Sequence, residues 1–111
     1  MKISFLVPAH NEEKIIAKTI SSLTNLPYDD YEILIGLDGC SDNTLNIVKQ
    51  FQKKSSKIKY YELNSRRGKP EVIDFIIKKA TGSIIIINDA DWQFKVNKKE
   101  DLQKMISLFN D

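Results

Sequence analysis

The sequence predicts a single α/β domain with an open, mostly parallel sheet flanked by helices. Short apolar runs alternate along the chain with segments in which apolar residues recur every three or four positions. This alternation is typical of repeated strand-helix-strand units, which build parallel sheets. With 111 residues and an apolar fraction of 41%, the chain is long enough for one compact core, so residues 1–111 are expected to form one domain.

Four short apolar runs are the expected strands. Their bounds are Ile3 to Val7, which Pro8 ends, then Tyr31 to Leu37, Ile58 to Leu63, and Ser83 to Asn88. The last run contains four consecutive isoleucines, and an uninterrupted apolar strand is typical of burial on both faces. We therefore expect this strand in the interior of the sheet.

Each strand is followed by a segment of helical period. Asn11 and Ser41 are the expected N-caps of the first two helices. Pro70 suits the first turn of the third helix, and Gly82 is expected to end it. Asn97 is expected to cap a last helix. The residues expected to face the core are Ile16, Ile20 and Leu23, then Thr44, Ile47, Val48 and Phe51, then Val72, Ile73, Ile76, Ile77 and Ala80, and finally Leu102, Met105, Ile106 and Phe109.

Right-handed crossovers restrict how four such units can be wound, and the Rossmann-like strand order 3-2-1-4 is the expected arrangement. In that order the C-terminal ends of strands 2, 1 and 4 are neighbours, and ligands of open α/β sheets bind at such an edge. Three polar segments would then converge there, which are Pro8 to Glu12, Asp38 with Gly39, and Asp89 to Asp91.

The pair Asp89 and Asp91 follows a strand too apolar to need them for solubility. An Asp-x-Asp sequence alone is often a pair of solvated loop carboxylates or helix caps, but its place after this strand favours a metal site. A hard divalent cation is commonly shared between one or two carboxylates and substrate phosphates. We therefore expect Mg²⁺ or Mn²⁺ holding a diphosphate here. Asp38 is expected either to stabilise the turn or helix that follows it, or to accept a hydrogen bond from a base N–H.

Composition excludes several other classes of function. The net charge of +2 is spread along the chain, so neither nucleic acid nor an anionic membrane is an expected partner. The longest aliphatic run, Ile84 to Ile87, is far shorter than the roughly 20 residues of a membrane helix, so no membrane segment is expected. The single cysteine, Cys40, cannot form an internal disulfide, and together with the lack of a signal peptide it predicts a cytoplasmic location.

Three blocks in order resemble the family-2, inverting glycosyltransferases of GT-A fold. These are Val7 to Glu13 after the first strand, Asp38 to Thr44 after the second, and the DXD motif Asp89-Ala90-Asp91 after the fourth. The Gly68-Lys69 pair and the isoleucine strand between the blocks also resemble that family. The resemblance spans nearly the whole chain.

The resemblance implies that the chain binds a nucleoside-diphosphate sugar, linked to UDP, GDP or dTDP, as a glycosyltransferase or its donor-binding part. Pro8, Ala9 and Glu12 would line the nucleoside pocket and Asp38 would contact the base. Lys69, together with Arg66, would lie near the base or the diphosphate. Asp89 would face the ribose or the metal, and Asp91 would be the more direct metal ligand.

No residue resembles the family's catalytic base, so the chain is expected to be truncated relative to a complete GT-A domain. The alternative is therefore a non-catalytic nucleotide-binding or assembly module, which a homo-oligomer or a second polypeptide would complete. A nucleotidyltransferase or dinucleotide enzyme ranks last, because no Gly-x-Gly-x-x-Gly follows the first strand.

Overall fold

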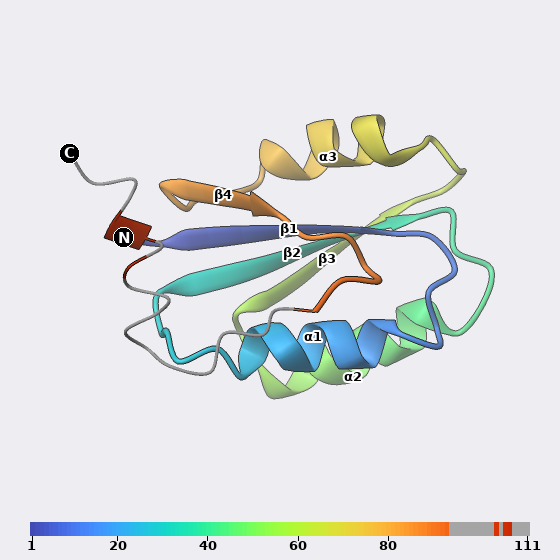
Figure 1. Ribbon diagram of the computed structural model, residues 1–111. Coiled ribbons are helices and arrows are strands. Elements are labelled where there is room, and N and C mark those ends of the chain that lie inside the picture. The colour runs from blue at the N-terminus through green and yellow to red at the C-terminus, as the bar shows by residue number, and fades with distance from the viewer. Residues whose placement is uncertain (94–103, 105, 108–111) are drawn as a thin grey trace.

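The computed structural model describes residues 1–93, 104, 106 and 107. Strands and helices alternate strictly along this part of the chain, as Figure 1 shows. The elements are β1 (Ile3–Ala9), α1 (Ile16–Thr24), β2 (Tyr31–Asp38), α2 (Thr44–Lys54), β3 (Ile58–Leu63), α3 (Lys69–Ile77) and β4 (Ile84–Ile87).

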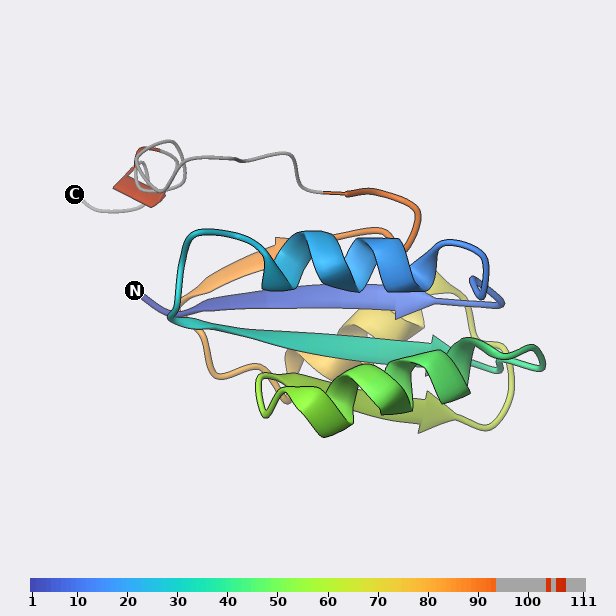
Figure 2. The ribbon, with the colours of Figure 1, turned by 90° about the horizontal axis from the view of Figure 1, so that it is seen from below.

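The four strands form one parallel sheet in the order β3-β2-β1-β4, which confirms the predicted order. Helices α1 and α2 cover one face of the sheet and α3 covers the other (Figures 1 and 2). Because all four strands run in the same direction, the loops that leave β1, β2 and β4 emerge at one edge.

Strand alternation divides the buried side chains between the two faces. Ile3, Phe5 and Val7 of β1 belong to the larger core, which also contains Ile16 and Ile20 of α1. The smaller core beneath α3 is formed by three fully buried residues, Leu6, Leu34 and Ile76. Each such side chain contributes roughly 1.5–3 kcal/mol through burial, so both helical layers are held to the sheet mainly by apolar contact.

Strand β1 continues through Pro8 to Ala9, whereas the sequence predicted that Pro8 would end it. The pairing with β4 stops at Leu6, while the pairing with β2 continues to Ala9. Proline lacks an N–H but is tolerated where a strand is paired on one side only. The strand therefore carries Pro8 and Ala9 directly to the edge of the sheet where the loops meet.

Strand β4 was expected in the interior of the sheet, and this prediction is wrong for the part of the chain that the structure describes. It lies at the end of the strand order, next to β1 alone. Ile84 is buried, but Ile85 and Ile87 are 38% and 50% exposed because α3 packs over β1 and β2 instead. The isoleucine run thus did not signal burial on both faces.

Two predicted N-caps are also wrong. Helix α1 begins at Ile16 without a side-chain cap, and Asn11 instead adopts a positive φ of 49° in the loop before it. Helix α2 begins at Thr44, and its N-cap position is Asn43, without a side-chain capping bond, rather than Ser41. The Thr44 backbone N–H donates instead to Asp42 Oδ1 at 3.0 Å. Sequence spacing alone did not show where each helical turn starts.

Helix α3 ends at Ile77 rather than at Gly82, and Ile77 is 40% exposed rather than inward-facing. Pro70 lies in its first turn as predicted. Of the residues expected to face the core from the last helix, Ile106 is buried. Its predicted cap Asn97 and its predicted core residues Leu102, Met105 and Phe109 lie outside the described residues.

A buried carboxylate lies at the N-terminal edge of the sheet, opposite the loops that leave β1, β2 and β4. Glu32 of β2 is 2% exposed. It accepts hydrogen bonds from Ser4 Oγ at 2.7 Å and from the Thr81 backbone N–H at 2.6 Å, and it pairs with Lys59 Nζ at 3.0 Å. Burial alone would raise the pKa of Glu32, but these hydrogen bonds favour the charged form and lower the pKa from 4.5 to about 2.

We expect this carboxylate to make the free energy of unfolding depend on pH in the acidic range. Since its folded-state pKa lies below the unfolded value, its contribution is complete above about pH 4.5 and is lost as the pH falls toward about 2. Roughly 2 kcal/mol should disappear between pH 7 and pH 3. Urea unfolding of Glu32→Gln should lack this loss, whereas the exposed control Glu62→Gln should retain it. Equal losses in wild type and Glu32→Gln would contradict the assignment.

Candidate functional site

The loops after β1, β2 and β4 enclose a cavity of about 320 Å³. The residues that line it are Pro8, Ala9, His10, Glu12, Asp38, Arg66, Lys69, Asp89, Ala90 and Asp91. All eight residues predicted for the site from the sequence, Arg66 included, lie on this one crevice. Their individual roles stay predictions.

The loops after β1 and β2 are tied together by hydrogen bonds that run in both directions. Asn11 Oδ1 accepts from the backbone N–H groups of Ser41 at 2.8 Å and Asp42 at 3.2 Å. In return, the Glu12 backbone N–H donates to Thr44 Oγ1 at 2.9 Å. The Asn11 side chain thus accepts from the loop before α2 rather than capping α1. These hydrogen bonds join the loops after β1 and β2 into one side of the crevice.

Asp38 lines the crevice between the loop after β1 and the loop before α3. Its carboxylate is 3% exposed, and its two oxygens accept from the backbone N–H groups of Arg67 at 2.7 Å and Gly68 at 2.9 Å. Neither expected structural role is observed, since Asp38 holds a loop about 30 residues later in the chain. Carboxylate oxygens offer about four acceptor positions, so Asp38 retains capacity for a ligand N–H.

Gly39 permits the close approach of that loop. Its φ is +60°, and a Cβ at this position would lie 2.6 Å from the Arg66 backbone nitrogen. Any other L-residue would be strained there and would collide with backbone. The turn after Asp38 and the basic loop can therefore pack together only through glycine.

His10, which the sequence placed in the loop after the first strand, lines the crevice. Its Nδ1 donates to the Asp38 carbonyl oxygen at 2.6 Å, and the Asn11 side-chain amide donates to its Nε2 at 3.4 Å. The contact with a carbonyl oxygen requires a hydrogen on Nδ1 and holds the ring in place between the loops after β1 and β2. The sequence indicated this position because His10 directly follows Ala9 in the same loop as the predicted site residues.

Lys69 and Asp89 bring the basic loop and the acidic loop together. The Lys69 ammonium forms an ion pair with Asp89 Oδ1 across the crevice, and both side chains are about half exposed. The sequence placed both residues in the site but did not predict this pairing.

The acidic loop is anchored through its backbone. Ala90 is buried, and its carbonyl oxygen accepts from Thr19 Oγ1 of α1. Asn88 Nδ2 donates to the carbonyl oxygens of Asp89 and Trp92, each at 2.9 Å. The loop therefore buries its central residue and leaves the exposed Asp89 and Asp91 on either side of it.

This arrangement suits a metal that is shared with a ligand. Within the described residues, no three His, Cys, Asp or Glu side chains converge to form a complete metal cage. Asp89 and Asp91 supply hard oxygen donors at the crevice, and Mg²⁺ is usually held by one or two carboxylates with water and substrate phosphates completing its shell. The residues thus fit a metal that arrives with a diphosphate.

Cys40 is unsuited to act as a nucleophile. It is partly buried, and its thiol donates to the Ala9 carbonyl oxygen at 3.5 Å. Burial raises the pKa of the thiol, with the Asp42 and Asp38 charges adding to the effect. A raised pKa disfavours the reactive thiolate.

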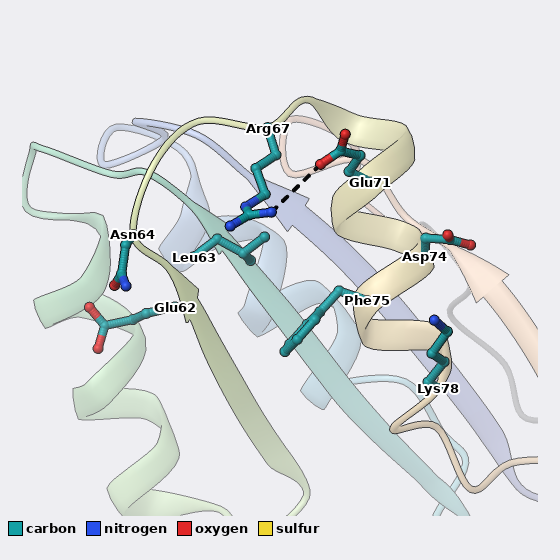
Figure 3. Close-up of a pocket in the computed structure, with 8 residues that line it drawn as sticks. All are labelled: Glu62, Leu63, Asn64, Arg67, Glu71, Asp74, Phe75 and Lys78. Atoms are coloured by element: carbon teal, nitrogen blue, oxygen red, sulfur yellow. Dashed lines mark ion pairs between the residues drawn. The ribbon is translucent and has the colours of Figure 1, made fainter.

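A larger cavity of about 530 Å³ lies beside α3 and is shown in Figure 3. Its lining residues are Glu62, Leu63, Asn64, Arg67, Glu71, Asp74, Phe75 and Lys78. Its acidic and basic side chains are intermixed, and Arg67 pairs with Glu71 within the same segment at 3.9 Å. We assign the site to the smaller crevice, because the carboxylates and the exits of β1, β2 and β4 meet there.

Comparison with known proteins identifies the family. The family model described as glycosyl transferase family 2 matches residues 4–111. The chain belongs to this family, which confirms the resemblance found in its sequence.

Two curated relatives are similar to this chain over most of its length. Poly-beta-1,6-N-acetyl-D-glucosamine synthase of Staphylococcus epidermidis is 39% identical over 89 residues, covering 80% of this chain and 21% of that protein. Poly(ribitol-phosphate) beta-glucosyltransferase of Bacillus spizizenii is 35% identical over 94 residues, covering 82% and 15%. The chain thus spans about a fifth or less of the length of these relatives.

A solved structure shows the same fold. S. aureus TarS 1–349 in complex with UDP-GlcNAc has 27% identity and a TM-score of 0.86, covering 99% of this chain and 31% of that one. Together with the 3-2-1-4 sheet, this similarity confirms the predicted GT-A fold.

We expect Asp38 to order the basic loop before α3. Asp38→Ala leaves the Arg67 and Gly68 N–H groups without their acceptor, at a cost of about 1–3 kcal/mol. Hydrogen exchange at these two amides should accelerate at least about fivefold. The exposed control Asp74→Ala should leave both rates unchanged. Wild-type protection of the two amides in Asp38→Ala would show that the loop does not depend on this carboxylate.

Proposed function

We propose that this chain supplies the donor site of a metal-dependent glycosyltransferase that uses a nucleoside-diphosphate sugar. The observation that carries the proposal is the meeting of Asp38, Lys69 and the Asp89–Asp91 loop on one crevice at the exits of β1, β2 and β4. Family membership and the sugar transferases among the relatives support the same class of activity.

The nucleoside is proposed to lie between Pro8, Ala9, Glu12 and Asp38. Pro8 and Ala9 end a rigid buried strand, so they offer a fixed apolar surface to a flat base or ribose. Asp38 can accept a base N–H while retaining its bonds to the loop. A uracil or guanine ring carries such an N–H, and the UDP-GlcNAc complex of TarS favours UDP as the first probe.

The diphosphate is proposed to lie between Lys69 and the acidic loop. Asp91 and Asp89 would hold Mg²⁺ or Mn²⁺, which offsets the negative charge that develops on the leaving diphosphate. Lys69 neutralises Asp89 in the structure and would supply positive charge to the same phosphates. Arg66, also on the crevice, adds to this positive side.

The second candidate is a binding or assembly module without turnover. This candidate is supported by the expected absence of the family's base motif, which stays a prediction. Exposed Ile85 and Ile87 on β4 offer an apolar surface for a homo-oligomer or a completing polypeptide. Transfer of sugar by the isolated chain would exclude this candidate.

The cytoplasmic location also stays a prediction. Within the described part of the chain, no helix has the length and apolar character needed to cross a bilayer.

We expect nucleotide binding to depend on the acidic loop and on metal. In calorimetry, UDP should bind with Mn²⁺ present and at least about tenfold more weakly in EDTA, and Asp91→Asn should lose a similar factor, equal to about 1.4 kcal/mol. Asp74→Asn, which changes an exposed carboxylate on α3, is the control and should bind like wild type. GDP in place of UDP reports the base preference. Equal affinity for UDP with and without metal would rule out the proposed metal role.

We expect removal of the Lys69 charge to strengthen the binding of metal alone and to weaken the binding of nucleotide. Lys69→Met removes the cation that competes for Asp89, so Mn²⁺ alone should bind about two- to fivefold more tightly. The Mn²⁺-dependent affinity for UDP should fall, because the diphosphate loses a positive partner. Electron paramagnetic resonance of free Mn²⁺ and calorimetry with UDP measure the two effects. Lys78→Met is the matched control, and changes of the same sign in both measurements would contradict this role.

A further inference from the structure

We propose that Glu32 is a positioning residue that sets the register of β4 against β1 and thereby places Asp89 and Asp91 in the crevice. It lies at the N-terminal edge of the sheet, about six residues or roughly 20 Å along β2 from Asp38. The consequence for nucleotide binding rests on the proposed function, but the register itself does not.

The register of β4 is poorly specified by its own side chains. Ile84 pairs with Ile3 and Ile87 pairs with Leu6. A strand normally fixes its register because a slip by one residue moves its apolar side chains to the wrong face. In β4 such a slip would replace Ile84 and Ile86 on the α1 face by Ile85 and Ile87, which are identical. The apolar pattern therefore barely distinguishes the two registers.

A slip would nevertheless displace the acidic loop. One residue of strand corresponds to about 3.3 Å and reverses the faces to which successive side chains point. Asp89 follows β4 by two residues, so its carboxylate would leave the position opposite Lys69. Correct placement of the acidic pair thus requires a contact that recognises particular residues beside β4.

Glu32 makes that contact through the segment just before β4. Its Oε2 accepts from both the backbone N–H and the hydroxyl of Thr81, at 2.6 Å and 3.1 Å. The same oxygen accepts from Ser4 Oγ at 2.7 Å, and Ser4 Oγ in turn accepts from the Gly82 N–H at 2.8 Å. One buried carboxylate on β2 therefore joins β1 to the two residues that precede Ser83 and Ile84.

Gly82 makes the recognition specific. A Cβ at this position would lie 2.5 Å from Ser4 Oγ and 2.8 Å from the Lys2 carbonyl oxygen, so only glycine can pack there unchanged. A slipped register would bring Ser83 or Thr81 to that place. It would also leave the Glu32 charge without its Thr81 donors, which is costly in a buried setting.

The contacts at the other end of β4 are less selective. Asn88 bonds through its side chain only within its own loop, to Asp89 and Trp92. Thr19 bonds to the Ala90 carbonyl oxygen, and a carbonyl is present at every residue. Glu32, through the Thr81 hydroxyl, thus acts with Gly82 and with the burial of Ala90 to distinguish one register from the next.

The test compares Glu32→Leu with the same substitution at an exposed glutamate of the sheet, Glu62→Leu. Register is read without nucleotide from nuclear Overhauser effects that join Ile3 to Ile84 and Leu6 to Ile87. In Glu32→Leu these effects should weaken or shift, and Mn²⁺-dependent UDP affinity should fall at least about tenfold. Glu62→Leu should change neither. If Glu32→Leu does not fold, Gly82→Ala is the substitute and should disturb the same effects.

A rescue variant separates register from stability. Ile85→Thr with Ile87→Thr gives β4 an alternating pattern that itself specifies the observed register, and both side chains are already exposed. In this background Glu32→Leu should recover the cross-strand effects and the affinity, although its thermal stability stays low. Nuclear Overhauser effects of wild-type strength in Glu32→Leu, or no recovery of these effects in the alternating background, would overturn the proposal. Absence of UDP binding in wild type would instead refute the proposed function and leave the register test intact.

Discussion

The pairing of β1 with strands on both sides is the constraint on which the crevice depends. Strand β1 pairs with β2 as far as Ala9 and with β4 as far as Leu6, all in parallel. This pairing places the exit of β1 between Asp38 of β2 and the acidic loop after β4. A shift of either neighbour by one residue, about 3.3 Å, would separate groups that now line one cavity.

Two buried carboxylates on β2 stabilise the two ends of this arrangement. Asp38 binds the backbone of the loop that carries Lys69, and Glu32 binds the segment that leads into β4. Both accept hydrogen bonds from backbone N–H groups of loops that lie outside the regular strands and helices. The carboxylates of β2 thus organise the loops that bring Lys69 and Asp89 together.

The crevice combines a fixed side with an adjustable side. Pro8 and Ala9 are buried in the sheet, and Asn11 and Thr44 bond the first two loops to each other. Lys69 and Asp89, in contrast, are about half exposed and are joined by one ion pair. In the proposed function, Pro8 and Ala9 would offer a preformed surface to the nucleoside, and Lys69 and Asp89 would meet a metal and diphosphate that complete the coordination shell.

The sequence by itself determined the alternation of strands and helices, the strand order and the set of residues that line the crevice. The alternation, the strand order and the segments after strands 1, 2 and 4 follow from apolar periodicity and from the rule that parallel strands end at one edge. Lys69 and Arg66 were placed at the site only by the resemblance to the family. Only the tertiary structure decided that Asn11 bonds to the loop before α2 and that Asp38 holds the backbone of Arg67 and Gly68. These outcomes depend on contacts between residues about 30 or more positions apart, and the local pattern around each residue carries no information about such partners.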